Sequence, residues 1–192
     1  MPFTHDFSDC EKWLEEETDL YSFSCQDGHY HFVAKAPKRS DSSVTALSEA
    51  ADRLSISVDA AFKDSDGLDA VGLGCWQGRD VSSPGYRLVV GPAGWDIESE
   101  LGDGTAESLP ASESGLEPQV SGDGFALRVE CVAGPSETTL RLFLNGTLLG
   151  TAHDDDQGVG GFDQVGMIVS ASKAPVAVDF DNFHVEEAEP ST

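Results

Sequence analysis

The sequence predicts an all-β protein, folded as a sandwich of two antiparallel sheets. Apolar and polar residues alternate with a period of two through most of the 192 residues, whereas helical periodicity is nearly absent. Turn sequences that contain glycine separate the alternating runs. A chain of this length holds roughly a dozen short strands, which two packed sheets accommodate better than one open sheet.

The clearest strand is expected over residues 54–62, where every second residue is apolar and the residues between are mostly polar. One face of this strand should therefore be core and the other solvated. The same alternation occurs over 125–131 and 140–144. These three runs are the firmest basis for the sandwich.

Two dipeptides predict tight hairpins. Asp27-Gly28 joins residues 21–25 to 29–34, and Asn145-Gly146 joins 139–144 to 147–152. Both favour the positive φ angles of two-residue turns. Each pair of runs should therefore form neighbouring antiparallel strands.

A meander of four further strands is expected between these hairpins, over 68–77, 86–90, 94–101 and 105–109. Glycine and proline separate these runs, and the stretches 78–85 and 110–118 are expected to be surface loops. A helical turn is expected within 43–52.

The last strand is expected over 176–186. Val178 and Phe180 share one face, but Phe183 continues the apolar pattern out of register, which predicts a bulge near Asp181-Asn182. The sandwich should thus form one domain over residues 1–187, with a polar tail over 188–192.

The charge excludes several classes of partner. Eleven Lys and Arg against 35 Asp and Glu give a net charge of −24, which repels nucleic acid and anionic membrane surfaces. No apolar run approaches the ~20 residues of a membrane span, and the first residues lack the features of a signal peptide. We therefore expect neither nucleic-acid binding nor direct membrane insertion.

The four cysteines are Cys10, Cys25, Cys75 and Cys131, and none are spaced as a zinc knuckle or a thioredoxin motif. They are either four buried thiols or two disulfides formed in an oxidising compartment. Cys75 and Cys131 each alternate with apolar residues, so both should point into the core. Strand phase therefore favours a disulfide 75–131. Cys10 and Cys25 both lie in the N-terminal segment, where a disulfide 10–25 would close a short loop around Trp13.

The order of several motifs resembles bacterial domains with the concanavalin A-like lectin/glucanase (laminin G-like) jelly roll. The matching segments cover most of the chain, namely 6–9, Trp13, Tyr21, 27–32, 56–60, 71–76, 85–88, 142–146, 165–169 and 178–183. The resemblance implies a jelly-roll sandwich of an extracytoplasmic protein, either secreted or anchored at the cell surface. Because this sandwich hosts lectins, hydrolases and adhesion modules alike, it does not settle the function.

A binding surface is expected in the meander. Trp76 points away from the core beside Gly72 and Gly74, so its indole ring could stack on a sugar. Arg87, Asp96 and Glu98 occupy the outward phase of the neighbouring strands and could bond its hydroxyls. The alternative is that a loop such as 78–85 covers Trp76.

The same strand carries a candidate catalytic pattern, Asp96-x-Glu98-x-Glu100. Retaining glucanases of this fold present Glu-x-Asp-x-Glu, but Gly94 stands at the nucleophile position when Asp96 and Glu98 are aligned with its last two carboxylates. With 35 acidic residues in the chain, a solvated strand face is the favoured interpretation of these carboxylates.

No cofactor is required by these patterns, and calcium is the metal that they allow. Asp154, Asp155 and Asp156 form the densest acidic cluster, although the spacing of a calcium loop is absent. A solvated acidic loop is the favoured alternative.

The sequence thus predicts a non-catalytic, extracytoplasmic recognition module that binds carbohydrate or another cell-envelope component. It should be a monomer that forms one domain of a longer protein. The alternatives are a glycoside hydrolase or related sugar-active enzyme, and a sensory or structural protein-binding domain without a small ligand.

Overall fold

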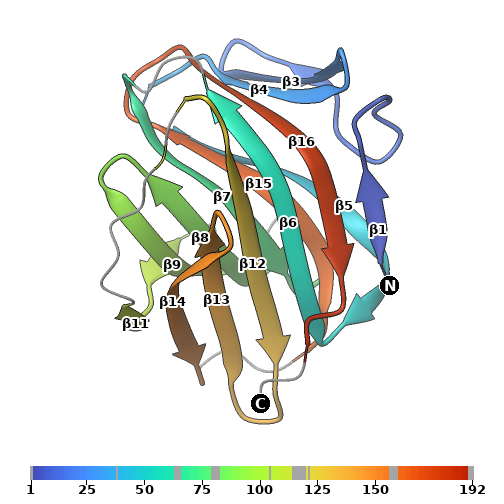
Figure 1. Cartoon of the computed structure of the whole chain (residues 1–192), viewed down its shortest axis with the longest axis vertical. Helices are drawn as coiled ribbons and strands as arrows, with labels where there is room; N and C mark the ends of the chain where they lie inside the picture. Colours follow the sequence, from blue (N-terminus) through green and yellow to red (C-terminus); the bar gives the residue numbers. More distant parts are fainter. Residues whose placement is uncertain are drawn as a thin grey trace.

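The structure is a computed structural model that describes residues 2–37, 39–62, 66–78, 83–103, 105–113, 120, 122–155 and 160–189. Within these ranges the chain forms strands and no helix, and the strands pair antiparallel into two sheets packed face to face (Figure 1). The described residues accordingly include no helix that could cross a membrane. The predicted all-β sandwich is confirmed.

The larger sheet has ten strands in the order β11-β14-β13-β12-β6-β16-β4-β3-β2, and β1 also pairs with β16. Its strands are β1 (Phe3–His5), β2 (Glu16–Glu17), β3 (Tyr21–Gln26), β4 (His29–Ala34), β6 (Arg53–Phe62), β11 (Ala111–Glu113), β12 (Phe125–Ala133), β13 (Thr138–Leu144), β14 (Thr147–Asp154) and β16 (Val176–Glu186). The predicted strands at 54–62, 125–131 and 140–144 lie at its centre.

The smaller sheet has six strands in the order β10-β9-β8-β7-β15-β5 and lies behind the larger sheet in Figure 1. Its strands are β5 (Arg39–Ala51), β7 (Leu68–Trp76), β8 (Gly85–Gly91), β9 (Gly94–Glu100), β10 (Ala106–Ser108) and β15 (Phe162–Ala171). The predicted meander is therefore β7 to β10.

The helical turn expected within 43–52 is wrong. These residues belong to the edge strand β5, which pairs with β15, and Ser43 and Thr45 are buried on its inner side. Ladder hydrogen bonds and burial against the larger sheet outweigh the weak helical propensity of this run.

The turns and the bulge follow the prediction. Asp27 and Gly28 have φ angles of 54° and 79°, and Asn145 and Gly146 have 51° and 77°. Positive φ at both positions is the geometry of a type I′ hairpin turn. The register of β16 against β6 shifts between Asp181 and His184, so the predicted bulge is confirmed.

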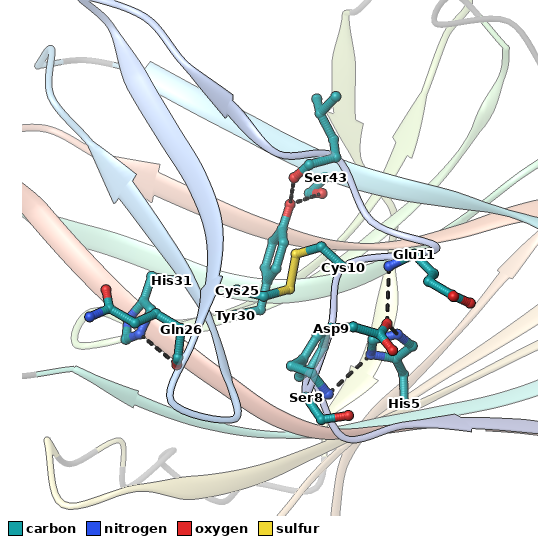
Figure 2. The surroundings of a disulfide bond; sticks show 12 residues. His5, Ser8, Asp9, Cys10, Glu11, Cys25, Gln26, Tyr30, His31 and Ser43 are labelled. Atoms are coloured by element: carbon teal, nitrogen blue, oxygen red, sulfur yellow. Dashed lines mark hydrogen bonds and ion pairs between the residues drawn. A yellow bond between two sulfur atoms is a disulfide. The ribbon is translucent and has the colours of Figure 1, made fainter.

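Both predicted disulfides are present. Cys75–Cys131 joins β7 to β12 across the core, and Cys10–Cys25 joins the segment after β1 to β3 (Figure 2). No cysteine is free.

At the other end of the chain, Ala188 is buried, and its carbonyl accepts hydrogen bonds from the Arg53 guanidinium at 3.0 and 2.7 Å. The sandwich contacts thus reach one residue beyond the predicted boundary at 187.

Candidate functional site

The outer face of the six-stranded sheet carries the residues that alternate with its core residues. On β7, β8 and β9 they form three rows across the sheet: Trp76-Gly85-Glu100, Gly74-Arg87-Glu98 and Gly72-Val89-Asp96. The structure therefore brings the four predicted ligand-binding residues onto one face.

Trp76 lies flat on this face because two glycines leave room for its ring. A Cβ atom at Gly74 would lie 2.8 Å from the indole Cζ2, and one at Gly85 would lie 2.7 Å from Cγ. The indole Nε1 donates a hydrogen bond to Glu100 Oε2 at 3.0 Å. Position and orientation of the ring are thus both determined.

The indole is not an open platform, because only 5% of the Trp76 surface is exposed. Trp76 points outward as predicted, but the covered alternative is the one that the structure adopts. Val89 and Ile168 pack with it into a small apolar cluster on the outer face. Residues 79–82 of the loop predicted to cover it lie outside the described residues.

Trp76 borders a cavity of about 340 Å³ that we call the Trp76 cavity. The cavity is shared between the six-stranded sheet, including its edge strand β5, and the N-terminal region. Its lining residues are Leu14, Glu16, Tyr21, Phe23, Asp41, Ser42, Val44, Trp76, Glu100 and Gln164. This mixture of aromatic and apolar surface with a few polar groups is typical of small-ligand sites.

The predicted carboxylates Asp96 and Glu98 are not among the residues that line the Trp76 cavity, and both have partners within the protein. Asp96 Oδ2 accepts a hydrogen bond from Ser108 at 2.5 Å, and Glu98 Oε2 lies 3.5 Å from Nε of Arg87. Arg87 also donates a hydrogen bond from Nη2 to the hydroxyl of Ser40. Arg87 thus lies between the carboxylate row of β9 and the edge strand β5.

Glu98 has a perturbed acidity. Burial raises the pKa of its carboxyl above the usual value of 4.5; Arg87 opposes this shift, whereas the negative charges of Asp96 and Glu100 add to it. The carboxyl is nevertheless paired with Arg87, so its environment is that of a partly desolvated ion pair.

A second hollow, of about 210 Å³, lies on the far side of the Arg87–Glu98 row. Its lining is mostly small and apolar, with carboxylates at the border, and consists of Asp69, Ala70, Val89, Gly91, Ala93, Gly94, Trp95 and Asp96. The outer face therefore has hollows on both sides of this ion pair.

The predicted calcium ligands are not brought together in the described residues. Asp154 ends β14, is 5% exposed, and accepts a hydrogen bond from the Tyr86 hydroxyl at 3.0 Å. The expectation that Asp154 lies in a solvated loop is wrong, because the strand continues to this residue and turns it inward. Asp155 is exposed, and Asp156 lies outside the described residues.

Within the described ranges, no group of three or more His, Cys, Asp or Glu side chains is arranged to hold a metal. Calcium binding stays a prediction from the sequence.

Sequence reasoning missed most of the cavity's lining. Gln164 lies beside Trp76 only because β15 pairs with β7. Leu14 and Glu16 come from a segment without a clear alternation of apolar and polar residues. Glu100 had a usable signal, because it shares the outward phase of Asp96 and Glu98 on β9.

No protein-family model matches the chain, and no curated protein matches it in sequence. Several solved structures share its fold. A sialidase superimposes with a TM-score of 0.66 at 11% identity, covering 98% of this chain and 18% of the sialidase chain. The chain thus spans less than one fifth of that enzyme.

Two further matches have the size of this chain. The carbohydrate-binding module CBM66 from Bacillus subtilis has a TM-score of 0.63 at 18% identity, covering 92% of this chain and 96% of the module. A beta-glucanase from Bacillus licheniformis has a TM-score of 0.60 at 9% identity, covering 97% and 98%. The fold is therefore a concanavalin A-like jelly roll, and its structural neighbours include carbohydrate-binding and glycan-cleaving proteins.

Proposed function

We propose that this protein is a non-catalytic recognition module that binds carbohydrate at the Trp76 cavity. The observation that carries the proposal is Trp76 itself, seated on two glycines and held by Glu100 at the wall of a cavity. The ring supplies an apolar edge for the C–H groups of a sugar, and Gln164, Ser42 and Glu100 supply hydrogen-bonding groups for its hydroxyls.

The charge of the cavity narrows the class of sugar. Glu16, Asp41 and Glu100 line the cavity, whereas no Lys or Arg is among its described lining residues. An anionic sugar such as a uronic acid would be repelled by these carboxylates. The proposed ligands are therefore neutral or amine-bearing saccharides, including those of a cell envelope.

The proposed location is outside the cytoplasm, with the protein secreted or held at the cell surface. Two disulfides in a domain of this size are typical of oxidising compartments. The negative charge agrees with this setting because it favours solubility.

A sugar-cleaving activity is the second candidate, because the raised pKa of Glu98 suits a general acid. The neighbouring carboxylates argue against it. Asp96 accepts a hydrogen bond from Ser108, and Glu100 accepts one from Trp76. Both of the other carboxylates of the pattern therefore already have partners. Binding without cleavage fits these contacts better.

Glycan-array binding of the oxidised protein tests the proposal. The wild type should bind a subset of neutral or amine-bearing glycans, and Trp76→Ala should weaken this binding by about tenfold or more. Leu148→Ala is the matched control, since Leu148 is an exposed apolar residue of the other sheet and should not affect binding. A folded Trp76→Ala variant that binds as the wild type does would contradict the site.

The same glycans test the enzymatic alternative. We expect no release of reducing sugar from a polysaccharide panel. Release that disappears in the Asp96→Asn/Glu98→Gln double variant would establish the hydrolase instead. A wild type that neither binds nor cleaves any glycan would favour a sensory or protein-binding domain.

A further inference from the structure

The two disulfides differ in their accessibility to solvent. Cys75 and Cys131 are completely buried between the sheets. Cys10 and Cys25 are both partly exposed, on the segment after β1 and near the end of β3 (Figure 2). A small thiol can reach only a disulfide that solvent reaches, so thiol–disulfide exchange should discriminate between the two bonds.

The exposed disulfide fixes one end of residues 10–17, which we call the N-terminal strap. The middle of the strap is held by Trp13, whose buried ring lies 4.8 Å from that of Phe183 and 5.6 Å from that of Tyr30. The Tyr30 hydroxyl donates a hydrogen bond of 2.6 Å to the Leu14 carbonyl. It makes another hydrogen bond of 2.6 Å with the Ser43 hydroxyl (Figure 2). The strap is thereby placed against the edge strand β5.

The other end of the strap is held more weakly. Strand β2 has only two residues, Glu16 and Glu17, which pair with Phe23 and Ser22 of β3. The Tyr21 hydroxyl donates a hydrogen bond to Glu16 Oε2 at 3.0 Å. Without the disulfide, the strap would be attached through Trp13, the Leu14 carbonyl, these short contacts, the Glu17–Lys35 ion pair at 3.0 Å and the contact of Lys12 with the Phe3 ring.

The strap also forms part of the Trp76 cavity, since Leu14 and Glu16 line it. The position of this wall therefore depends on contacts that include the Cys10–Cys25 bond. The opposite wall, with Trp76 and Glu100, is built on β7 and β9, and neither strand carries a cysteine of that disulfide.

We propose that Cys10–Cys25 is a redox-sensitive disulfide that holds the strap in place as one wall of the Trp76 cavity. Its reduction by a small thiol loosens the strap and weakens ligand binding. One thiolate attacks a sulfur of the disulfide and forms a mixed disulfide, and a second thiol releases it. Two thiols are oxidised to one disulfide, while Cys10 and Cys25 each gain an electron and a proton. Cys75–Cys131 and the sandwich stay intact. This inference rests on the proposed function of the cavity.

Differential labelling tests the selectivity without any glycan. The folded protein is treated with glutathione or dithiothreitol, alkylated, and mapped by peptide mass spectrometry. Cys10 and Cys25 should be alkylated in the folded protein, and Cys75 and Cys131 only after denaturation. Equal alkylation of all four cysteines, or of none, would overturn the proposal.

Hydrogen exchange tests the loosening. After reduction, amides of residues 11–17 should exchange at least about fivefold faster, because the strap opens locally. Amides of β7 should exchange at an unchanged rate. An unchanged rate in the strap would overturn the proposal even if the bond is reduced.

Binding of an array-identified glycan tests the functional consequence. Reduction should weaken binding by about three- to tenfold, since the ligand must then order the loosened wall. The Cys10→Ala/Cys25→Ala variant should bind like the reduced wild type and should not respond to thiol. Equal binding before and after reduction would overturn this inference while leaving the proposed function standing. If the oxidised protein binds no glycan, the proposed function fails, and labelling and exchange still decide whether the strap is redox-sensitive.

Discussion

Trp95 of β9 and Trp76 of β7 lie on opposite faces of the six-stranded sheet, and each packs its indole ring against glycine. Trp95 points inward and lies over Gly150 of β14, where an added Cβ would be 2.7 Å from its Cζ3 atom. Trp76 points outward and lies over Gly74 and Gly85 of its own sheet. In both places glycine provides the space that a flat indole ring occupies.

The surroundings of the two rings differ. Trp95 packs against the core and helps to join the two sheets. Trp76 lies among Glu100, Glu98 and Arg87, and the sandwich closes without it. The role proposed for Trp76 is ligand binding, whereas the contacts of Trp95 are those of a packing residue. Substitutions at the supporting glycines should separate these two roles.

The largest effect on stability is expected at Gly150. Gly150→Ala pushes a methyl group into the Trp95 ring within the sandwich, and such overpacking costs about 1–3 kcal/mol of unfolding free energy. Urea unfolding monitored by circular dichroism measures the loss. Glycan binding of the remaining folded protein should be unchanged. A variant as stable as the wild type would show that the Trp95 ring can move away from the added methyl group. It would contradict the interpretation of Trp95 as a tightly packed core residue.

The matched change on the outer face is Gly74→Ala, which brings a methyl group to 2.8 Å from Cζ2 of Trp76. The indole must shift away from Glu100, so glycan binding should fall by about tenfold. The loss of unfolding free energy should be smaller than for Gly150→Ala, because Trp76 packs in a small cluster on the outer face and not in the core between the two sheets. If Gly74→Ala loses stability but keeps its affinity, Trp76 is a packing residue only.

The hydrogen bond between Trp76 and Glu100 should have a smaller effect. Glu100→Ala leaves the indole N–H without its acceptor, which should cost about 1 kcal/mol and lower glycan affinity by roughly fivefold. Glu100→Gln keeps an acceptor oxygen and should stay within about twofold of the wild type. Isothermal titration with one bound glycan measures both. Equal losses for the two variants would point to the charge of Glu100 rather than to its hold on Trp76.

The fold could be predicted largely from local pattern, because alternation and turn chemistry act within single strands. Asp27-Gly28 and Asn145-Gly146 marked their hairpins, and the phases of Cys75 and Cys131 predicted the disulfide across the core. The helical turn expected within 43–52 was wrong, because β5 is determined by its pairing with β15, which no local pattern reveals.

Only the part of the candidate site that depends on the alternation of residues along single strands could be predicted. Phase placed Trp76, Arg87, Asp96 and Glu98 on one face, but it could not tell that Trp76 would lie flat and be nearly covered. That outcome depends on Gly85, which is brought beside Trp76 by the pairing of β7 with β8. The N-terminal wall of the cavity depends on contacts far apart in the sequence, such as that between Tyr30 and Leu14.

The smallest expected effect is the pH dependence of stability that Glu98 causes. It tests whether the charged groups next to Trp76 are shielded from water. Burial raises the pKa of Glu98, so between its usual value of 4.5 and the raised value the folded protein binds more protons than the unfolded chain. The contribution of Glu98 to stability should therefore fall as the pH rises through this window. Glu98→Gln removes this dependence.

Thermal unfolding of the wild type and of Glu98→Gln between pH 4 and pH 7 measures this contribution. The wild type should lose stability relative to the variant as the pH rises. Asp103→Asn is the control of opposite sign, because hydrogen bonds from Thr105 lower the pKa of Asp103, so that its contribution is lost as the pH falls. A pH-independent difference between the wild type and Glu98→Gln would mean that the outer face beside Trp76 is solvated. The Glu98 carboxylate would then behave as a solvated surface charge, and the burial of Trp76 would not extend to the charged row beside it.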